Sequence, residues 1–203
     1  MNWIQLRSKI KSLISSGHSN SFDYTQNIAN IILQELNIMN EHYMCNIWEI
    51  PIQDICLRLG IQIIEVYNMK NHLSILDVRK DPIIYIPFDL SINDKRVEIA
   101  RQFGHLMMHP LDRVYHGRNV PWIYSSDNSE YKLSQMAQLF AMHILVPRMC
   151  LGVWLSSFPS RSIIKKIIDW IFDNPIPKQP TYSEASNLFG TPEYFIKFQR
   201  MSL

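Results

Sequence analysis

Two histidines with the spacing of a metal-ligand pair stand near the end of a predicted helix, His105 and His109. Residues four apart lie on the same helical face, so their imidazoles can share one metal ion. Glu130, at the start of a second predicted helix, would supply a third ligand from the facing element. The alternative is structural, and we favour it. His105 is then a buried, hydrogen-bonded side chain, and His109 is a cation favoured by the dipole at the helix C-terminus.

The elements that position these residues are two predicted central helices, which cover residues 94–109 and 130–146. Pro110 and Pro147 end them, because proline cannot continue an α-helix. Three short runs rich in β-branched residues precede the helices and are predicted to be strands, at residues 61–67, 73–78 and 83–86.

Further helices are indicated by apolar residues that recur at helical spacing. They fall in the first 17 residues and at about 22–39, 51–59, 160–173, 182–189 and 192–201, with a proline-rich linker at 175–180. Together these elements predict an α+β fold. It is mainly helical, with a small three-stranded antiparallel sheet and a short helical C-terminal subdomain.

The overall composition is that of a folded, near-neutral protein. The chain has 203 residues, of which 47% are hydrophobic and 19% charged, with a net charge of +2. This balance excludes wholesale disorder and lacks the basic excess of a general nucleic-acid binder. Cys45, Cys56 and Cys150 form no C-x-x-C pair and fit a reducing cytoplasm. Because we find neither a signal peptide nor an apolar run long enough to span a bilayer, we expect a cytoplasmic protein with no membrane partner.

Three segments, in order, resemble the ImmA/IrrE family of zinc metallopeptidases. Residues 50–61 match a short helix that ends in a leucine-glycine turn before the first strand. Residues 97–109 stand where the family has an alanine, H-E-L-G-H, apolar residues and a further histidine. Residues 137–147 are similar to the family helix E-x-x-A-N-x-F-A-x-x-L-L-M-P. In addition to these three segments, the tail at 183–190 resembles part of the closing helix pair of the family.

The resemblance covers about residues 45–203 and implies a zincin-like fold, with a metallopeptidase-like domain at 45–174 and helix-turn-helix-like helices at 175–203. N-terminal helices at 1–44 form a third part of the predicted organisation. Residues 1–44 lie outside the resemblance.

The family positions that do the chemistry are occupied here by other residue types. The resemblance places the first zinc ligand at Arg101, the general base at Gln102 and the last ligand at Ser134, leaving His105 alone. A guanidinium has no lone pair to donate, and an amide does not serve as a proton acceptor. The resemblance therefore implies a member with no catalytic residues, no metal and no cofactor, whereas the rearranged site would hold zinc.

An emptied zinc site leaves a buried polar pocket that must be filled. Arg101 lies one turn before His105, so we expect its cation to replace the charge of the metal. Its expected partners are Ser134, Gln102 or Glu130. The alternative is that Arg101 is a solvated residue on the surface of an unrelated helix.

Three aromatic residues in the predicted loop after Pro110 are candidates for binding a peptide beside the degenerate site, Tyr115, Trp122 and Tyr124. The alternative is that they pin the loop to the core. The C-terminal helices within 183–200 have helix-turn-helix-like spacing and carry Lys197 and Arg200. We favour packing of these helices against the body of the protein over DNA reading.

The expected function is that of a catalytically inactive ImmA/IrrE-like protein that binds a protein partner. Active relatives cleave helix-turn-helix repressors, often on mobile elements or in stress responses, so the resemblance implies such a repressor, or an antitoxin, as the partner. Two alternatives stay open. One is a metal-dependent endopeptidase with a rearranged site, and the other is a DNA-binding regulator that acts through 183–200.

Overall fold

Two long helices, α5 (Ile92–Met108) and α7 (Ser129–Leu145), form the centre of the fold. The structure is a computed structural model that describes residues 1–13, 21–38, 48–69, 74–109, 129–156 and 181–201, with the side chains of 129–131 left out. The two helices approach closely at Gly104, where an added Cβ would lie 2.6 Å from Cδ1 of Phe140. Both helices lie within two residues of their predicted bounds.

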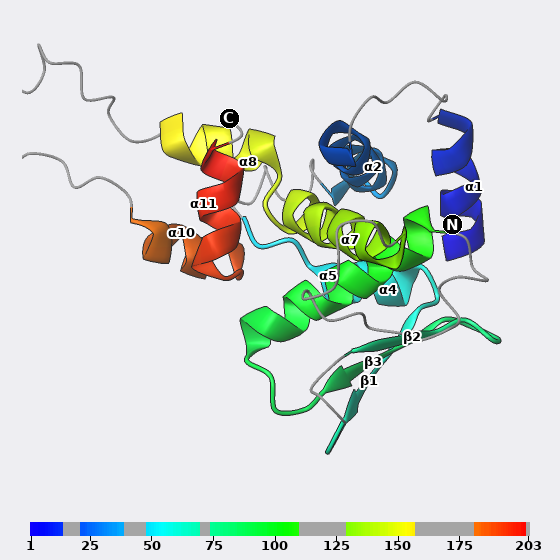
Figure 1. Ribbon diagram of the computed structural model, residues 1–203. Coiled ribbons are helices and arrows are strands. Elements are labelled where there is room, and N and C mark those ends of the chain that lie inside the picture. Colours follow the sequence, from blue (N-terminus) through cyan, green and yellow to red (C-terminus); the bar gives the residue numbers. More distant parts are fainter. Residues whose placement is uncertain (14–20, 39–47, 70–73, 110–128, 157–180, 202–203) are drawn as a thin grey trace, which may run out of the picture.

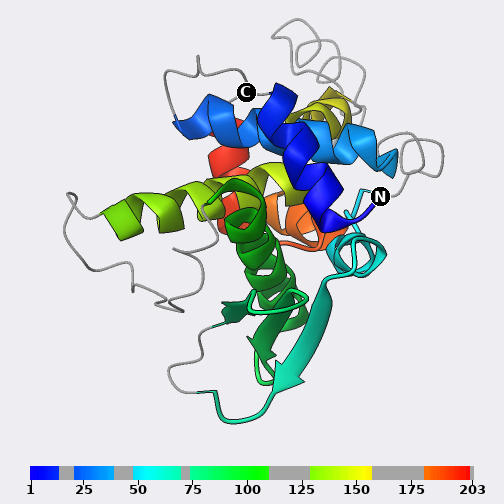
Figure 2. The same cartoon turned by 90° about the vertical axis from the view of Figure 1, so that its right-hand side faces the viewer.

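A three-stranded sheet lies beside α5, on the side away from α7 and α2 (Figures 1 and 2). It consists of β1 (Gln62–Val66), β2 (Ile75–Asp77) and β3 (Ile83–Pro87), in the order β1-β3-β2. The central strand β3 points two isoleucines into the core, Ile84 and Ile86, and packs against α5. The sheet therefore covers one face of the helix that carries the candidate site.

The prediction of an antiparallel sheet is wrong for one of the two strand pairs. β2 and β3 are antiparallel, with Ile75 opposite Tyr85, but β1 and β3 are parallel, with Gln62 opposite Ile83. The chain turns back after β2, so β3 takes the centre and runs in the same direction as β1. Residue periodicity reports which side chains face the core, but it does not report which neighbour a strand takes.

The N-terminal helices α1 (Trp3–Leu13) and α2 (Ser21–Glu35) contribute to the same hydrophobic core as α5 and α7. Leu6 and Ile10 of α1 are buried, and α2 packs along α7. The backbone N–H of Trp3 also donates to the carbonyl of Leu59, 3.1 Å away at the end of α4 (Ile52–Arg58).

The C-terminal helices α10 (Tyr182–Phe189) and α11 (Glu193–Met201) follow the bounds that the sequence predicts. A capping box between Thr181 and Glu184 begins α10, and Gly190 ends it in the left-handed conformation, with φ of 58°. α11 packs against α7 and α8 (Arg148–Ser156). The helix predicted at 160–173 lies outside the described residues.

In the part of the chain that the structure describes, no single helix has both the length and the apolar character needed to cross a bilayer. The segments Lys132–Leu145 and Arg148–Ser156 reach those criteria only when taken together across a bend of 43°.

Candidate functional site

Helix α5 carries the residues singled out in the sequence and is fixed at both ends. Ser91 caps its N-terminus, where the Oγ atom accepts a hydrogen bond from the backbone N–H of Asp94 at 3.2 Å. Its middle is buried on nearly all sides, because the sheet, α4 and α7 all contact it. Arg101 and Gln102 are consequently only 6% and 3% exposed.

Four polar side chains form a closed hydrogen-bonded group, here called the Arg101 cluster: Ser74, Glu98, Arg101 and Gln102. The guanidinium of Arg101 donates to Glu98 at 2.5 Å and to Oγ of Ser74 at 3.2 Å. The amide of Gln102 donates to the same Oγ at 2.8 Å, and Ser74 in turn donates to Glu98. One positive and one negative charge thus offset each other inside the fold.

The partners of Arg101 differ from those that we expected. Arg101 is buried, but it pairs with Glu98 of its own helix and with Ser74 beside β2. No described hydrogen bond joins Arg101 to Ser134, which is half-buried on α7. The side chain of Glu130 lies outside the described residues.

Tyr194 of α11 and Gln138 of α7 extend this polar region towards the surface. Their side chains share a hydrogen bond, and Asp94, Glu98 and Arg101 lie within electrostatic reach of the tyrosine hydroxyl. The pKa of Tyr194 is raised, mainly because the hydroxyl is desolvated, although 54% of the residue as a whole is exposed. Tyr194 is therefore a partly exposed residue within electrostatic reach of the Arg101 cluster.

His105 and His109 lie together, as their spacing predicts. Their Nδ1 atoms are 2.9 Å apart, so one imidazole donates a hydrogen bond and the other accepts it. Burial lowers the pKa of His105 well below its ordinary range, and His109 and Arg101 lower it further. Burial, reinforced by Arg7, lowers the pKa of His109 to about 4. Both histidines are therefore neutral at neutral pH.

The interpretation of His109 as a helix-terminal cation is wrong, because His109 is only 2% exposed and neutral. Arg7 of α1 supplies the positive charge instead, donating to the carbonyls of Leu106 and His109 at the C-terminal end of α5. The other nitrogen of His109, Nε2, is buried and has no hydrogen-bond partner among the described residues.

The surroundings of the histidine pair disfavour a metal cation. The guanidinium groups of Arg101 and Arg7 lower the pKa of His105 and His109 through repulsion of a positive charge, and they would repel a divalent ion in the same way. Within the described residues, no group of three His, Cys, Asp or Glu side chains is placed to hold a metal ion. The side chain of Glu130, the third ligand of the rearranged site, lies outside the described residues.

The other candidate residues divide between described and undescribed parts of the chain. Tyr115, Trp122 and Tyr124 lie outside the described residues. Lys197 and Arg200 are exposed on α11, and both cations stack on the ring of Tyr182, at 5.3 and 5.6 Å from its centroid.

The apolar face of α11 is turned inward, and the buried Gln199 donates to the carbonyl of Val146 at 2.8 Å. This leaves two cations on the exposed face of a helix held against the body. DNA binding through 183–200 stays a prediction.

Sequence reasoning missed four residues of this region: Arg7, Ser74, Glu98 and Tyr194. Glu98 carried a readable signal, because a carboxylate three residues before Arg101 lies on the same helical face. The other three come from α1, from the approach to β2 and from α11, and no local spacing links them to α5.

No protein-family model matches this chain, and none of the curated proteins searched matches it.

Proposed function

We propose that this protein is a catalytically inactive ImmA/IrrE-like regulatory protein that binds a protein partner next to the Arg101 cluster. The observation that carries the proposal is the buried Arg101, hydrogen-bonded to Glu98 and Ser74 at the position where the family has its first zinc ligand. A buried guanidinium can neither bind zinc nor act as a base. Gln102, at the position of the general base, is likewise engaged with Ser74.

The proposed partner is a helix-turn-helix repressor or an antitoxin in the cytoplasm, in a stress response or on a mobile element. The contact surface that we propose centres on Tyr194, which is exposed, lies within electrostatic reach of the cluster and is hydrogen-bonded to Gln138. Partly exposed tyrosines favour protein interfaces, because the ring is apolar and the hydroxyl can bond at the rim. Cys56 is a buried free thiol, which fits the proposed cytoplasmic location.

A restored metal site tests the family assignment. The variant Arg101→His/Gln102→Glu/Ser134→Glu recreates the family ligands and base on α5 and α7. If the two helices have the zincin-like arrangement, the folded variant gains about one zinc ion per chain, since three protein ligands complete such a site. A variant that keeps its circular dichroism spectrum but gains no zinc would contradict the assignment.

Partner capture tests the function itself. The native chain and the variant Tyr194→Ala are expressed in the source cells, cross-linked, purified and analysed by mass spectrometry. Tyr67→Ala is the matched control, because Tyr67 is 67% exposed beside the sheet. We expect a repressor or antitoxin with the native chain and the control but not with Tyr194→Ala. Equal recovery with all three chains would place the contact elsewhere.

The rearranged metal site remains a second candidate, because the two Nδ1 atoms at 2.9 Å are close to the separation that two ligands of one metal ion have. We rank it lower, since the positive charges of Arg7 and Arg101, beside the histidine pair, would repel a metal cation.

A further inference from the structure

The two edges of the sheet differ in how well they are protected from pairing with another strand. β2, at one edge, has three residues. Its last residue, Asp77, forms an ion pair with Arg79, and Pro82 follows. Short strands, charges and proline are features that block the addition of a further strand. β1, at the other edge (Figures 1 and 2), has five residues and contains no proline, glycine or lysine. Of the two edges, β1 is therefore the one open to a further strand.

The free side of β1 presents the backbone groups of Ile63 and Glu65. In a parallel pair, every second residue directs its N–H and C=O groups towards the neighbouring strand. The N–H of Gln62 donates to the carbonyl just before β3 at 2.9 Å, and the carbonyl of Val66 accepts from the N–H just after β3 at 3.0 Å. Ile64, midway between them, has the same phase. The groups of Ile63 and Glu65 consequently point the other way, where no described strand lies.

The side chains of β1 suit a longer sheet. Its one charged residue, Glu65, lies on the α5 side, where its carboxylate pairs with Lys95 at 2.8 Å. On the opposite face, Ile64, Tyr85 and Ile75 lie side by side in register across the three strands. Ile64 and Ile75 are 38% and 40% exposed. A strand added at β1 would continue this row and cover Ile64.

The pattern of β1 fits a second copy of itself in one register. If two copies pair antiparallel about a twofold axis at Ile64, Ile63 of each copy lies opposite Glu65 of the partner subunit. Both are then hydrogen-bonded pairs that exchange both N–H···O bonds, because these residues direct their groups outward. An axis at Glu65 would set two carboxylates opposite each other. An axis at Ile63 would pair Glu65 with Ile61, whose N–H already donates to Cys56 at 2.9 Å.

We infer that two copies of this chain associate through their β1 strands, antiparallel and with the axis at Ile64, so that their three-stranded sheets join into one. The strand complements itself, since both outward-facing residues are paired and no like charges meet. A strand pair of this length is a small interface, so we expect a dissociation constant of about 1–100 µM. The inference does not depend on the proposed function, because it uses neither the Arg101 cluster nor Tyr194.

Sedimentation velocity of the full chain, at concentrations of about 1–500 µM, tests this inference. We expect a concentration-dependent shift from monomer to dimer. Ile64→Lys sets two like charges opposite each other at the axis, so its dissociation constant should rise at least about tenfold.

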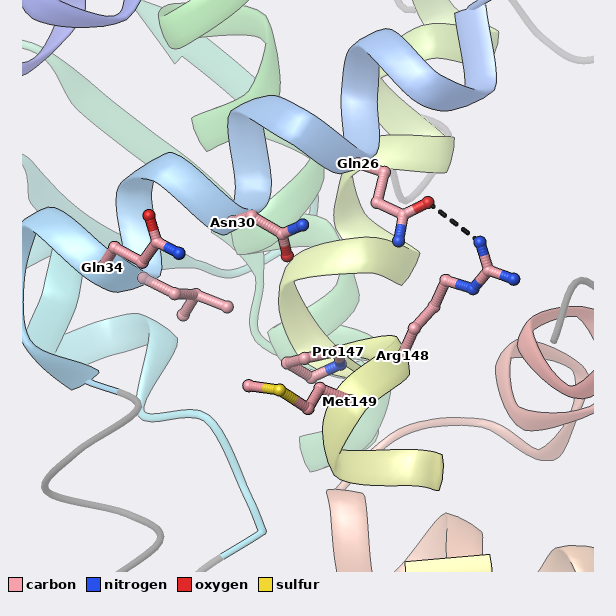
Figure 3. A pocket seen from close by; sticks show the side chains of 7 residues that line it. Gln26, Asn30, Gln34, Pro147, Arg148 and Met149 are labelled. Atoms are coloured by element: carbon pink, nitrogen blue, oxygen red, sulfur yellow. Dashed lines mark hydrogen bonds between the residues drawn. The ribbon is translucent and has the colours of Figure 1, made fainter. Parts of the chain in front are cut away.

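Two controls add the same charge elsewhere on the surface. Ile75→Lys is the matched control, because Ile75 has similar exposure on the same face but lies at the other edge of the sheet. Asn30→Lys places the charge in a groove between α2 and the start of α8 (Figure 3). Both variants should form dimers like the native chain.

Cross-linking and hydrogen exchange locate the contact. Under oxidation, Ile64→Cys should form a disulfide between two copies, because a non-hydrogen-bonded antiparallel pair has Cα atoms about 4.5 Å apart. The matched variant Ile75→Cys should not, and peptide mapping distinguishes these links from those of the native cysteines. The backbone amides of Ile63 and Glu65 should exchange more slowly in the dimer than in the monomer, because they become hydrogen-bonded.

The inference is overturned if the native chain stays monomeric throughout this range, or if either lysine control weakens the dimer as much as Ile64→Lys does. Equal cross-linking of Ile64→Cys and Ile75→Cys, or a dimer in which the amides of Ile63 and Glu65 are not slowed, would also contradict it. A monomer whose Ile63 and Glu65 amides are slowed by an added, capped threonine–valine pentapeptide would assign the edge to a strand of another protein.

Discussion

A buried arginine is stable only when its charge and its N–H groups are satisfied, and Glu98 and Ser74 do most of this for Arg101. Of the three guanidinium nitrogens of Arg101, Nε is the one that is buried without a hydrogen-bond partner among the described residues. The pair with Glu98 is therefore a structural interaction, and in the proposed family assignment Arg101 also stands at the position of a zinc ligand. Since 22% of the Glu98 side chain is exposed, water weakens the pair compared with a fully buried one.

We expect Arg101→Met to lower the free energy of unfolding by about 1–3 kcal/mol, because it leaves a mostly buried carboxylate without its partner. Arg79→Met is the matched control, since Arg79 pairs with Asp77 but has a side chain that is 65% exposed. The control should lose less stability than Arg101→Met, because solvent screens an exposed pair. Urea unfolding measures both, and equal losses would refute a buried pair.

The buried histidines predict a dependence of stability on pH. Burial lowers the pKa of His109 and of His143 to about 4 in the folded chain, from an ordinary 6.5. Between these values the unfolded chain binds protons that the folded chain does not, so stability falls as the pH drops through this window and is complete above it. Each histidine contributes a slope of at most about 1.4 kcal/mol per pH unit.

Urea unfolding between pH 4.5 and 7.5 should show this slope, and His109→Gln and His143→Gln should each flatten it. If the variant profiles run parallel to that of the native chain, these histidines are not buried in the neutral form.

At the scale of elements, the contact between α5 and α7 depends on a glycine. We expect Gly104→Ala to destabilise the fold by about 1–3 kcal/mol, because its Cβ would lie 2.6 Å from Cδ1 of Phe140. Gly152→Ala in α8 is the control, since no atom lies within 4 Å of its added Cβ and alanine favours a helix.

Thermal unfolding distinguishes Gly104→Ala from Gly152→Ala, because the melting temperature of Gly152→Ala should match or exceed that of the native chain. Phe140→Leu, which makes space at the contact, should recover part of the loss in Gly104→Ala. Equal stability of Gly104→Ala and Gly152→Ala would show that α5 and α7 are not in close contact.

Most helices and strands could be predicted from the sequence, because their apolar residues repeat with the period of the element and prolines mark their ends. α5 and α7 illustrate this, with Pro110 and Pro147 beyond them. The direction of β1 could not be predicted, since a strand shows the same alternation in either direction. The partners of Arg101 and the helix-end contact of Arg7 are long-range contacts, apart from Glu98, and no local pattern encodes them.

At the scale of the whole molecule, α1 is tied to the far end of α5 by Arg7, across about a hundred residues of sequence. We expect Arg7→Met to lower the free energy of unfolding by about 1–3 kcal/mol, because two helix-end carbonyls lose a buried charged donor. Lys9→Met on the same helix removes an exposed pair with Glu35 and should have little effect. Chemical denaturation measures the free energy of unfolding of both variants. A similar loss in Arg7→Met and Lys9→Met would argue against the buried contact of Arg7.

The proposed function implies a protein without a metal centre, and the metal content of the purified chain is the first quantity to measure. Untagged protein is analysed by elemental mass spectrometry, with and without added zinc, alongside His105→Ala and His109→Ala. Because Arg101 and Arg7 repel a cation at the histidine pair, we predict less than about a tenth of a metal ion per chain in all samples. About one ion per native chain, lost in either histidine variant, would contradict the proposed function and indicate a rearranged metalloenzyme.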